Sequence, residues 1–260
     1  MFDDGNLGGG PRTWRTGIGV GVQMSELLYQ GDSYIRDFEA RVIAVDADQG
    51  AVALDRTAFY PGGGGQPCDV GELVCGEQRV PVTRVKRVGE KVRHWLAGDL
   101  PQVGSTVFAA LDWELRYQHM RTHTALHILC GVVWRDYGAQ VTGGNMGALK
   151  GRMDFEFESL HKGLVQEIEE KVNHEVQQAR EVRVAILPRE EAFRIPDLIR
   201  TKVNLLPEGI AEVRTVEIVG LDLQADGGTH VANTQEVGRI EVVGYQSKGR
   251  INKRIRICLT

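Results

Sequence analysis

The chain has 260 residues, of which 42% are hydrophobic and 25% are charged, and its formal net charge is −4. These values are ordinary for a folded globular protein of one large or two modest domains, and they exclude a chain that is basic overall. No apolar run approaches the roughly 20 residues of a membrane-spanning helix, and the first residues lack the zones of a secretory signal. We therefore expect a cytoplasmic protein without membrane contact, either a monomer or a dimer.

Residues 1–23 are rich in glycine and weakly periodic, so we expect them to form a disordered leader. Residues 24–111 carry short β runs separated by turn residues, which predicts a small antiparallel barrel-like domain. The expected strands cover residues 38–45, 51–54, 72–74, 80–88, 92–96 and 106–110.

Four consecutive glycines, Gly62, Gly63, Gly64 and Gly65, occupy one connection of this domain, in the string T-A-F-Y-P-G-G-G-G-Q-P-C-D-V-G. Glycine adopts backbone angles that are closed to other residues. The connection is therefore either a flexible hairpin loop or a backbone surface shaped for the close approach of a ligand. A phosphate-binding glycine loop usually leads into a helix, and this one does not, which argues against a P-loop.

Residues 112–137 predict a long helix, with Asp112 as its N-cap and Gly138 just past its end. His123 and His127 stand four apart in this helix. They therefore share one face, with their Cβ atoms roughly 5–6 Å apart, so both imidazoles can reach one ion.

The remainder of the chain mixes strands and helices. Residues 140–157 predict two strands joined by a glycine turn, T-G-G-N-M-G, and residues 158–179 an amphipathic helix. Later elements are expected as a short helix at 189–193 and strands at 182–187, 211–219, 239–246 and 251–259. Residues 112–260 thus predict an α+β domain with helices packed on one face of an antiparallel sheet.

A third histidine, His230, closes the string A-D-G-G-T-H-V far along the chain. The glycine turn before it can point its side chain inward. Together with His123, His127 and Asp226, it would supply three or four ligands for Zn²⁺. Thr124 follows His123, so the H-E-x-x-H signature of zinc proteases, with its general base, is absent.

Basic residues are concentrated in the string S-K-G-R-I-N-K-R-I-R-I near the end of the chain. Isoleucines alternate with the charges there, which predicts a strand with a basic face. That strand is either an edge strand protected by charge or a strip that contacts phosphates.

Several long strings, in chain order, resemble the AlaX family of free-standing alanyl-tRNA editing proteins, in the form that keeps a glycine-rich N-terminal domain. R-T-H-T-A-L-H-I-L is similar to the first zinc motif of the alanyl-tRNA editing domain, and V-R-T-V-E-I-V-G-L-D-L-Q-A-D-G-G-T-H-V-A-N-T-Q-E-V-G to the second. F-Y-P-G-G-G-G-Q-P-C-D-V-G resembles the glycine-rich motif of the preceding domain. G-R-M-D-F and the basic string also fit, so the resemblance runs from about Met24 to the end.

The resemblance implies a zinc-dependent hydrolase that deacylates seryl-tRNA, or glycyl-tRNA, wrongly formed on alanine tRNA. Such a second site is needed because a pocket sized for alanine rejects an added hydroxyl poorly. The sequence departs from the family at Asp226, where the family's motif commonly has cysteine. The carboxylate is either a zinc ligand or holds His230 through a hydrogen bond.

The resemblance also implies roles for other residues. Thr142 is the candidate partner of the serine hydroxyl, with Thr122 and Thr124 as alternatives, and Gln66 would order the water or contact the terminal nucleotide. Residues expected to bind the tRNA, beside the four glycines, are Arg116, Arg121, Lys150, Arg152, Lys248, Arg250, Lys253 and Arg254.

Three other functions remain open. The chain could be a zinc-stabilised tRNA-binding module without activity, or it could edit seryl-tRNA formed on threonine tRNA, since related threonyl editing domains share the H-x-x-x-H pattern. A metallo-amidohydrolase acting on small molecules is disfavoured by the absence of the general-base glutamate and by the clustered basic residues.

Overall fold

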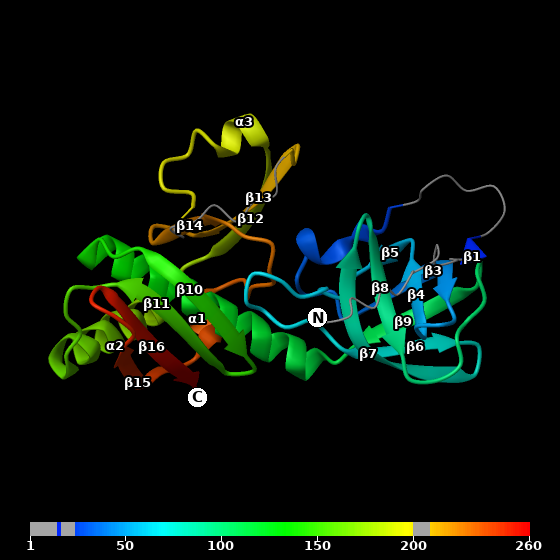
Figure 1. Ribbon diagram of the computed structural model, residues 1–260, viewed down its shortest axis with the longest axis horizontal. Helices are drawn as coiled ribbons and strands as arrows, with labels where there is room; N and C mark the ends of the chain where they lie inside the picture. The colour runs from blue at the N-terminus through cyan, green and yellow to red at the C-terminus, as the bar shows by residue number, and fades with distance from the viewer. Residues whose placement is uncertain (1–14, 17–23, 200–208) are drawn as a thin grey trace, which may run out of the picture.

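The computed structural model describes residues 15–16, 24–199 and 209–260. Within them, a closed antiparallel barrel is followed by a region of helices and antiparallel sheets (Figure 1), which confirms the predicted α+β class. The leader expected at residues 1–23 lies outside the described residues, apart from positions 15 and 16. None of the described helices is both long and apolar enough to cross a membrane.

The barrel closes because its last strand, β9, pairs with its first long strand, β3. The order is β3-β4-β8-β7-β6-β9, with β1 (Arg15–Thr16) added at β3. Its strands are β3 (Asp37–Asp46), β4 (Ala51–Leu54), β6 (Gly71–Cys75), β7 (Gln78–Val88), β8 (Lys91–Leu96) and β9 (Thr106–Leu111). Burial alternates along β3 and β9, so inward side chains such as Val42 and Val107 fill the barrel. Short additions are β2 (Glu26–Leu27), η1 (Leu28–Gln30) and β5 (Arg56–Thr57).

Helix α1 (Trp113–Tyr137) leads from the barrel into the second region. Its predicted ends are confirmed: Asp112 accepts a hydrogen bond from the Leu115 N–H at 3.1 Å, and Gly138 ends the helix with φ 63°. Every residue from 122 to 133 is buried. A helix that is buried on all sides forms the centre of a core, so the histidines of α1 lie inside the protein.

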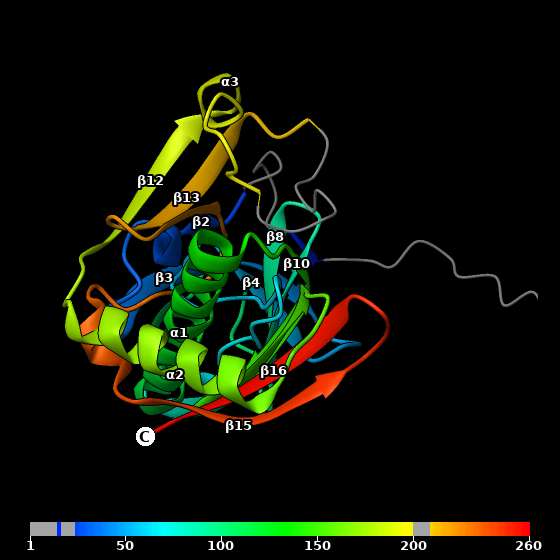
Figure 2. The same cartoon turned by 90° about the vertical axis from the view of Figure 1, so that its left-hand side faces the viewer.

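A four-stranded antiparallel sheet, in the order β10-β11-β16-β15, lies beside α1. Its strands are β10 (Val141–Gly147), β11 (Lys150–Glu156), β15 (Ile240–Ser247) and β16 (Asn252–Leu259). Helices α1 and α2 (Lys162–Gln177) cover one face of it, as Figure 2 shows. Helix α2 begins later than predicted, because the His161 side chain caps it by accepting a hydrogen bond from the Leu164 N–H.

The prediction of a glycine turn at T-G-G-N-M-G was wrong, because these six residues belong to strand β10. Gly144 pairs with Met153 in β11, and the chain turns at Ala148 and Leu149 instead. Close packing at this place depends on the barrel's glycine run, because a Cβ added at Gly65 would lie only 3.3 Å from the Gly144 carbonyl oxygen. The barrel can therefore approach this edge strand closely.

The prediction of a single sheet in the second half of the chain was also wrong. Besides the four-stranded sheet, this half contains a separate three-stranded antiparallel sheet in the order β12-β13-β14, which projects from the body together with α3 (Figure 1). The bounds are β12 (Val182–Pro188), α3 (Arg189–Ala192), β13 (Glu212–Ile218) and β14 (Asp222–Ala225). Strand β14, which the sequence did not predict separately, fills the second edge of β13. A capped turn, η2 (Thr234–Val237), connects to β15.

A buried ion pair fastens α1 to the barrel. Arg116 is 0% exposed, and its Nε lies 3.0 Å from both carboxylate oxygens of Asp69. Its Nη1 also donates to the Ser33 carbonyl at 2.9 Å. The expectation that Arg116 contacts tRNA phosphates was wrong, because the guanidinium is enclosed and fully paired within the protein.

We expect Arg116→Met to lower the free energy of unfolding by about 3–5 kcal/mol, because Asp69 would keep a buried charge without its partner. Denaturant titration measures this loss. Arg183→Met is the matched control, since it breaks a solvent-exposed ion pair with Glu181 and should cost less than about 1 kcal/mol. Equal losses in the two variants would contradict the structural role of Arg116.

Candidate metal centre and substrate cleft

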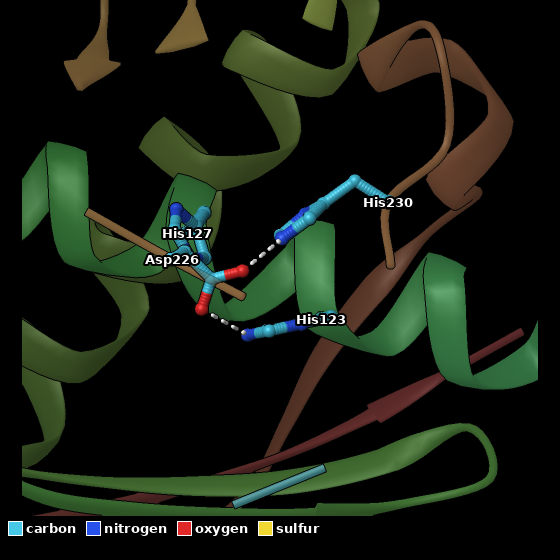
Figure 3. A group of neighbouring side chains, drawn as sticks. All are labelled: His123, His127, Asp226 and His230. Atoms are coloured by element: carbon cyan, nitrogen blue, oxygen red, sulfur yellow. Dashed lines mark hydrogen bonds and ion pairs between the residues drawn. The ribbon is translucent and has the colours of Figure 1, made fainter. Parts of the chain in front are cut away.

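Four side chains from separate segments meet between α1 and β14 (Figure 3). His123 and His127 come from successive turns of α1, Asp226 directly follows β14, and His230 lies four residues later. One potential ligand atom from each residue lies within 4.8 Å of the others. The structure therefore brings together the four residues that the sequence suggested as metal ligands.

Each of the three histidines has its Nδ1 atom engaged by a neighbouring side chain. These contacts join His123 to the Gln66 amide oxygen (3.0 Å), His127 to an Asp222 oxygen (3.1 Å) and His230 to the Thr124 hydroxyl (3.1 Å). Contacts of this kind fix the orientation and the tautomer of a metal-binding imidazole. With Nδ1 held, Nε2 is the atom that each ring has available for a ligand.

Asp226 lies between the imidazoles. Its Oδ2 is 3.0 Å from Nε2 of His230, and its Oδ1 is 3.6 Å from Nε2 of His123. The N–H of Gly228 donates to the same Oδ2 at 2.7 Å, and Nη1 of Arg214 lies 3.9 Å from it. These donors compensate a carboxylate that would otherwise be costly to bury.

The protonation states of the cluster follow from burial and charge. Burial lowers the pKa of His123 to about 4 and holds that of His230 well below its ordinary value, so both rings are neutral at neutral pH. Burial alone would raise the pKa of Asp226, but His123 and His230 outweigh it and keep that pKa well below normal. For His127, burial lowers the pKa, but the hydrogen bond and the charge of Asp222 raise it overall. The neutral His123 and His230 rings and the ionised Asp226 are therefore in the forms that bind a metal, whereas a metal at His127 would have to displace the proton that Asp222 favours.

A cleft of about 920 Å³ opens beside this cluster. Its walls combine the barrel's glycine run (Gly64 and Gly65), the edge strand β10 and apolar side chains such as Met153 and Leu198. Three nitrogen donors and one carboxylate at the side of such a cleft are a donor set that suits Zn²⁺.

The three candidate threonines differ in their surroundings. Thr142 lines the cleft and is exposed, and its hydroxyl donates to Asn252 Oδ1 at 3.2 Å. The hydroxyl of Thr122 is buried and donates to the Gln118 carbonyl within α1. Thr124 holds His230. Of these three, Thr142 is thus the residue whose side chain is open to the cleft.

The glycine run forms an ordered turn. All four of its residues have positive φ, a conformation that side chains disfavour, and Gly63 and Gln66 bond to each other through their backbones. This geometry favours the shaped backbone surface over the flexible hairpin. Gln66 itself is 3% exposed and turns toward His123 and Thr229.

The predicted tRNA-binding side chains are dispersed. Lys150, Lys248 and Arg250 are exposed, whereas Arg152 and Arg254 both pair with Asp154 on the outer face of the four-stranded sheet. Arg121 holds the Val237 and Thr260 carbonyls. Lys253 is only 6% exposed, and its Nζ donates to the Gly249 and Arg250 carbonyls. The expected phosphate contact of Lys253 was therefore wrong.

Sequence reasoning missed Asp222 and Arg214, which support the cluster from the three-stranded sheet. Asp222 holds His127, and Arg214 bridges the Gln30 and Asp226 carbonyls. The alternation Asp222, Gln224, Asp226 is a period-2 signal that could have placed all three on one strand face.

Gly228 lies directly against the metal-site side chains. A Cβ added there would lie 2.7 Å from the Gln66 amide oxygen and closer still to the His123 ring, whereas a Cβ at Gly227 meets nothing within 4 Å. The turn before His230 therefore needs a glycine at the second position and not at the first.

Known proteins match this chain over most of its length. The model of class II (A) tRNA synthetases matches residues 31–115, and the model of the threonyl and alanyl tRNA synthetase second additional domain matches residues 213–256. The alanyl-tRNA editing protein AlaX-M of Saccharolobus solfataricus is 41% identical over 89% of this chain and 98% of its own length. AlaX-M of Methanosarcina acetivorans is 38% identical over 91% and 99%. The alanine–tRNA ligase of Thermococcus kodakarensis is 37% identical over 83% of this chain but 24% of its own.

We expect Gly228→Ala to lose bound metal, because the new methyl group would displace the His123 ring or the turn that carries His230. Gly227→Ala, the neighbouring control, should bind metal like the unmodified protein. Elemental analysis of both purified variants, with circular dichroism to confirm folding, measures the difference. Full metal content in Gly228→Ala would argue against this packing.

Proposed function

This chain belongs to the AlaX-M family of alanyl-tRNA editing proteins, and we propose that it deacylates seryl-tRNA wrongly formed on alanine tRNA, with Zn²⁺ as its cofactor. Glycyl-tRNA is the second proposed substrate. The observation that carries the proposal is the convergence of His123, His127, His230 and Asp226 at one side of the cleft.

The donor atoms fit the proposed ion. His123, His127 and His230 would bind it through Nε2, because each Nδ1 is already engaged, and Asp226 is the proposed fourth ligand. Bound here, Zn²⁺ supplies Lewis-acid chemistry, which polarises a carbonyl oxygen or lowers the pKa of a water molecule. The protein's own residues hold the imidazoles in place, and burial keeps His123 and His230 neutral.

Thr142 is the proposed selector of serine over alanine. It lies on the cleft wall, and after donating to Asn252 its oxygen can still accept a hydrogen bond from a serine hydroxyl. Alanine offers no such donor. A hydroxyl-dependent contact discriminates more sharply than an apolar pocket does.

The tRNA would approach from the same side as the glycine run. We assign its phosphates to the exposed Lys150, Lys248 and Arg250, with Arg152 and Arg254 beside them, and the acceptor end to the backbone of residues 62–65. In this assignment residues 24–111 form the glycine-motif domain and residues 112–260 the editing domain.

Editing of seryl-tRNA on threonine tRNA is the second candidate function. The match over residues 213–256 is to a domain model that threonyl and alanyl synthetases share, so that match alone is compatible with either tRNA. A tRNA-binding module without activity is the third candidate, because Asp226 stands where the family commonly has a thiolate.

We expect the purified protein to deacylate seryl-tRNA made on alanine tRNA, to lose this activity on chelation and to regain it when Zn²⁺ is added. Cleavage of radiolabelled seryl-tRNA measures the rate, with alanyl-tRNA and seryl-tRNA on threonine tRNA as comparisons. A rate no faster than spontaneous hydrolysis would point to the binding module, and preference for threonine tRNA would point to the second candidate.

We expect Thr142→Val to lower kcat/KM for seryl-tRNA by about 5–30-fold, which corresponds to about 1–2 kcal/mol for a lost hydrogen bond. Valine keeps the shape of threonine but removes the hydroxyl. Thr122→Val is the control, because that hydroxyl bonds within α1, and it should leave the ratio of seryl to alanyl cleavage unchanged. An unchanged ratio in Thr142→Val would remove Thr142 from serine recognition.

A further inference from the structure

We propose that Gln66 is a positioning residue for the metal centre. Its amide oxygen holds Nδ1 of His123, so that Nε2 of the same ring faces the ion. The inference rests on the proposed Zn²⁺ dependence. It assigns to the barrel's glycine loop a task in the metal centre itself, in addition to any contact with the substrate.

The contacts of Gln66 leave one orientation for its amide. The oxygen lies 3.0 Å from Nδ1 of His123 and accepts the Thr229 N–H at 3.1 Å, while the amide nitrogen donates to the Thr229 hydroxyl at 2.8 Å. A backbone N–H can only donate, so turning the amide over would set two donors against each other. The atom that faces His123 is therefore the acceptor oxygen.

The orientation of the amide decides the tautomer of His123. Because the amide oxygen can only accept, Nδ1 of His123 must carry the hydrogen, which leaves the lone pair on Nε2. Nε2 is the atom that lies 3.6 Å from Asp226 Oδ1, toward the other metal-ligand candidates. Gln66 thus selects the form of His123 that can bind a metal at this position.

The loop that carries Gln66 is held rigidly along α1. Gln66 contacts His123 while Asp69, three residues later, pairs with Arg116, two helical turns before His123. The Gly65 carbonyl also accepts the Met146 N–H of β10 at 3.1 Å. A side chain anchored on both sides can hold an imidazole against rotation.

His123 differs from the other two histidines in the origin of its partner. Asp222 and Thr124, which hold His127 and His230, belong to the same region as the histidines, whereas Gln66 comes from the barrel. The metal centre is therefore completed across the boundary between the barrel and the second region. Both ends of the buried Gln66 amide are also occupied, so its observed contacts are with the protein's own residues.

The test compares Gln66→Met with Gln66→Glu in the full-length protein. Methionine matches the length of glutamine but offers no strong acceptor, whereas glutamate keeps an oxygen toward His123, and the Thr229 hydroxyl can turn to donate to the other oxygen. The Zn²⁺ dissociation constant, measured by competition with a chromophoric chelator, should rise about 10–100-fold in Gln66→Met. In Gln66→Glu it should stay within about threefold of the unmodified protein, well below the rise expected for Gln66→Met.

Several outcomes would overturn the inference. Unchanged affinity in Gln66→Met would do so, and so would equal losses in both variants, because the acceptor oxygen would then not be the cause. Denaturant unfolding of the metal-free variants shows whether a loss reflects general destabilisation instead, which would also count against it. Zinc affinity is measured without tRNA. Unmodified protein that binds Zn²⁺ but does not cleave seryl-tRNA would thus overturn the proposed function alone, and protein that binds none would overturn both.

Discussion

The buried ion pair between Arg116 and Asp69 fixes the position of the barrel relative to α1, and the candidate metal centre depends on that joint. Arg116 lies two turns before His123, and Asp69 lies three residues after Gln66. Helix α1 and the loop that follows the glycine run therefore contact each other at two places, through the Arg116–Asp69 ion pair and through the hydrogen bond between His123 and Gln66. Because both contacts are buried, a shift of the barrel would disturb the ion pair and the ligand together.

The centre itself balances burial against charge. Three imidazoles and a carboxylate are removed from water, which favours neutral rings and would favour a neutral carboxyl group. The pKa of Asp226 is nevertheless well below normal, and the Gly228 N–H and the Arg214 guanidinium compensate its charge where the His123 and His230 rings are neutral. A divalent cation bound among these side chains would compensate the negative charge of Asp226. Gln66, Asp222 and Thr124, which contact the Nδ1 atoms of the three histidines, already hold the rings in place.

Local signals in the sequence predicted much of this architecture. The ends of α1 follow from Asp112 and Gly138, and the long barrel strands from their own alternation. Burial of Arg116 could not be predicted, because its partner Asp69 lies far away in sequence and no local pattern marks a paired charge. Lys253 is different: it alternates with Ile255 and Ile257, so the period of the strand already indicated the buried face. The glycines of β10 misled because they lie inside a paired strand, where Gly144 is opposite Met153 of β11, and do not turn the chain.

The bond between Gln66 and Thr229 joins residues 163 positions apart. Closing a loop of this length costs conformational entropy, and folds that depend on contacts of long sequence separation form more slowly. While the polypeptide is being made, the paired histidines of α1 emerge well before Asp226 and His230. A metal ion encountered at that stage would find only the two histidines of α1. Tight binding would require Asp226 and His230 as well, so it would occur only after the second half of the chain has folded.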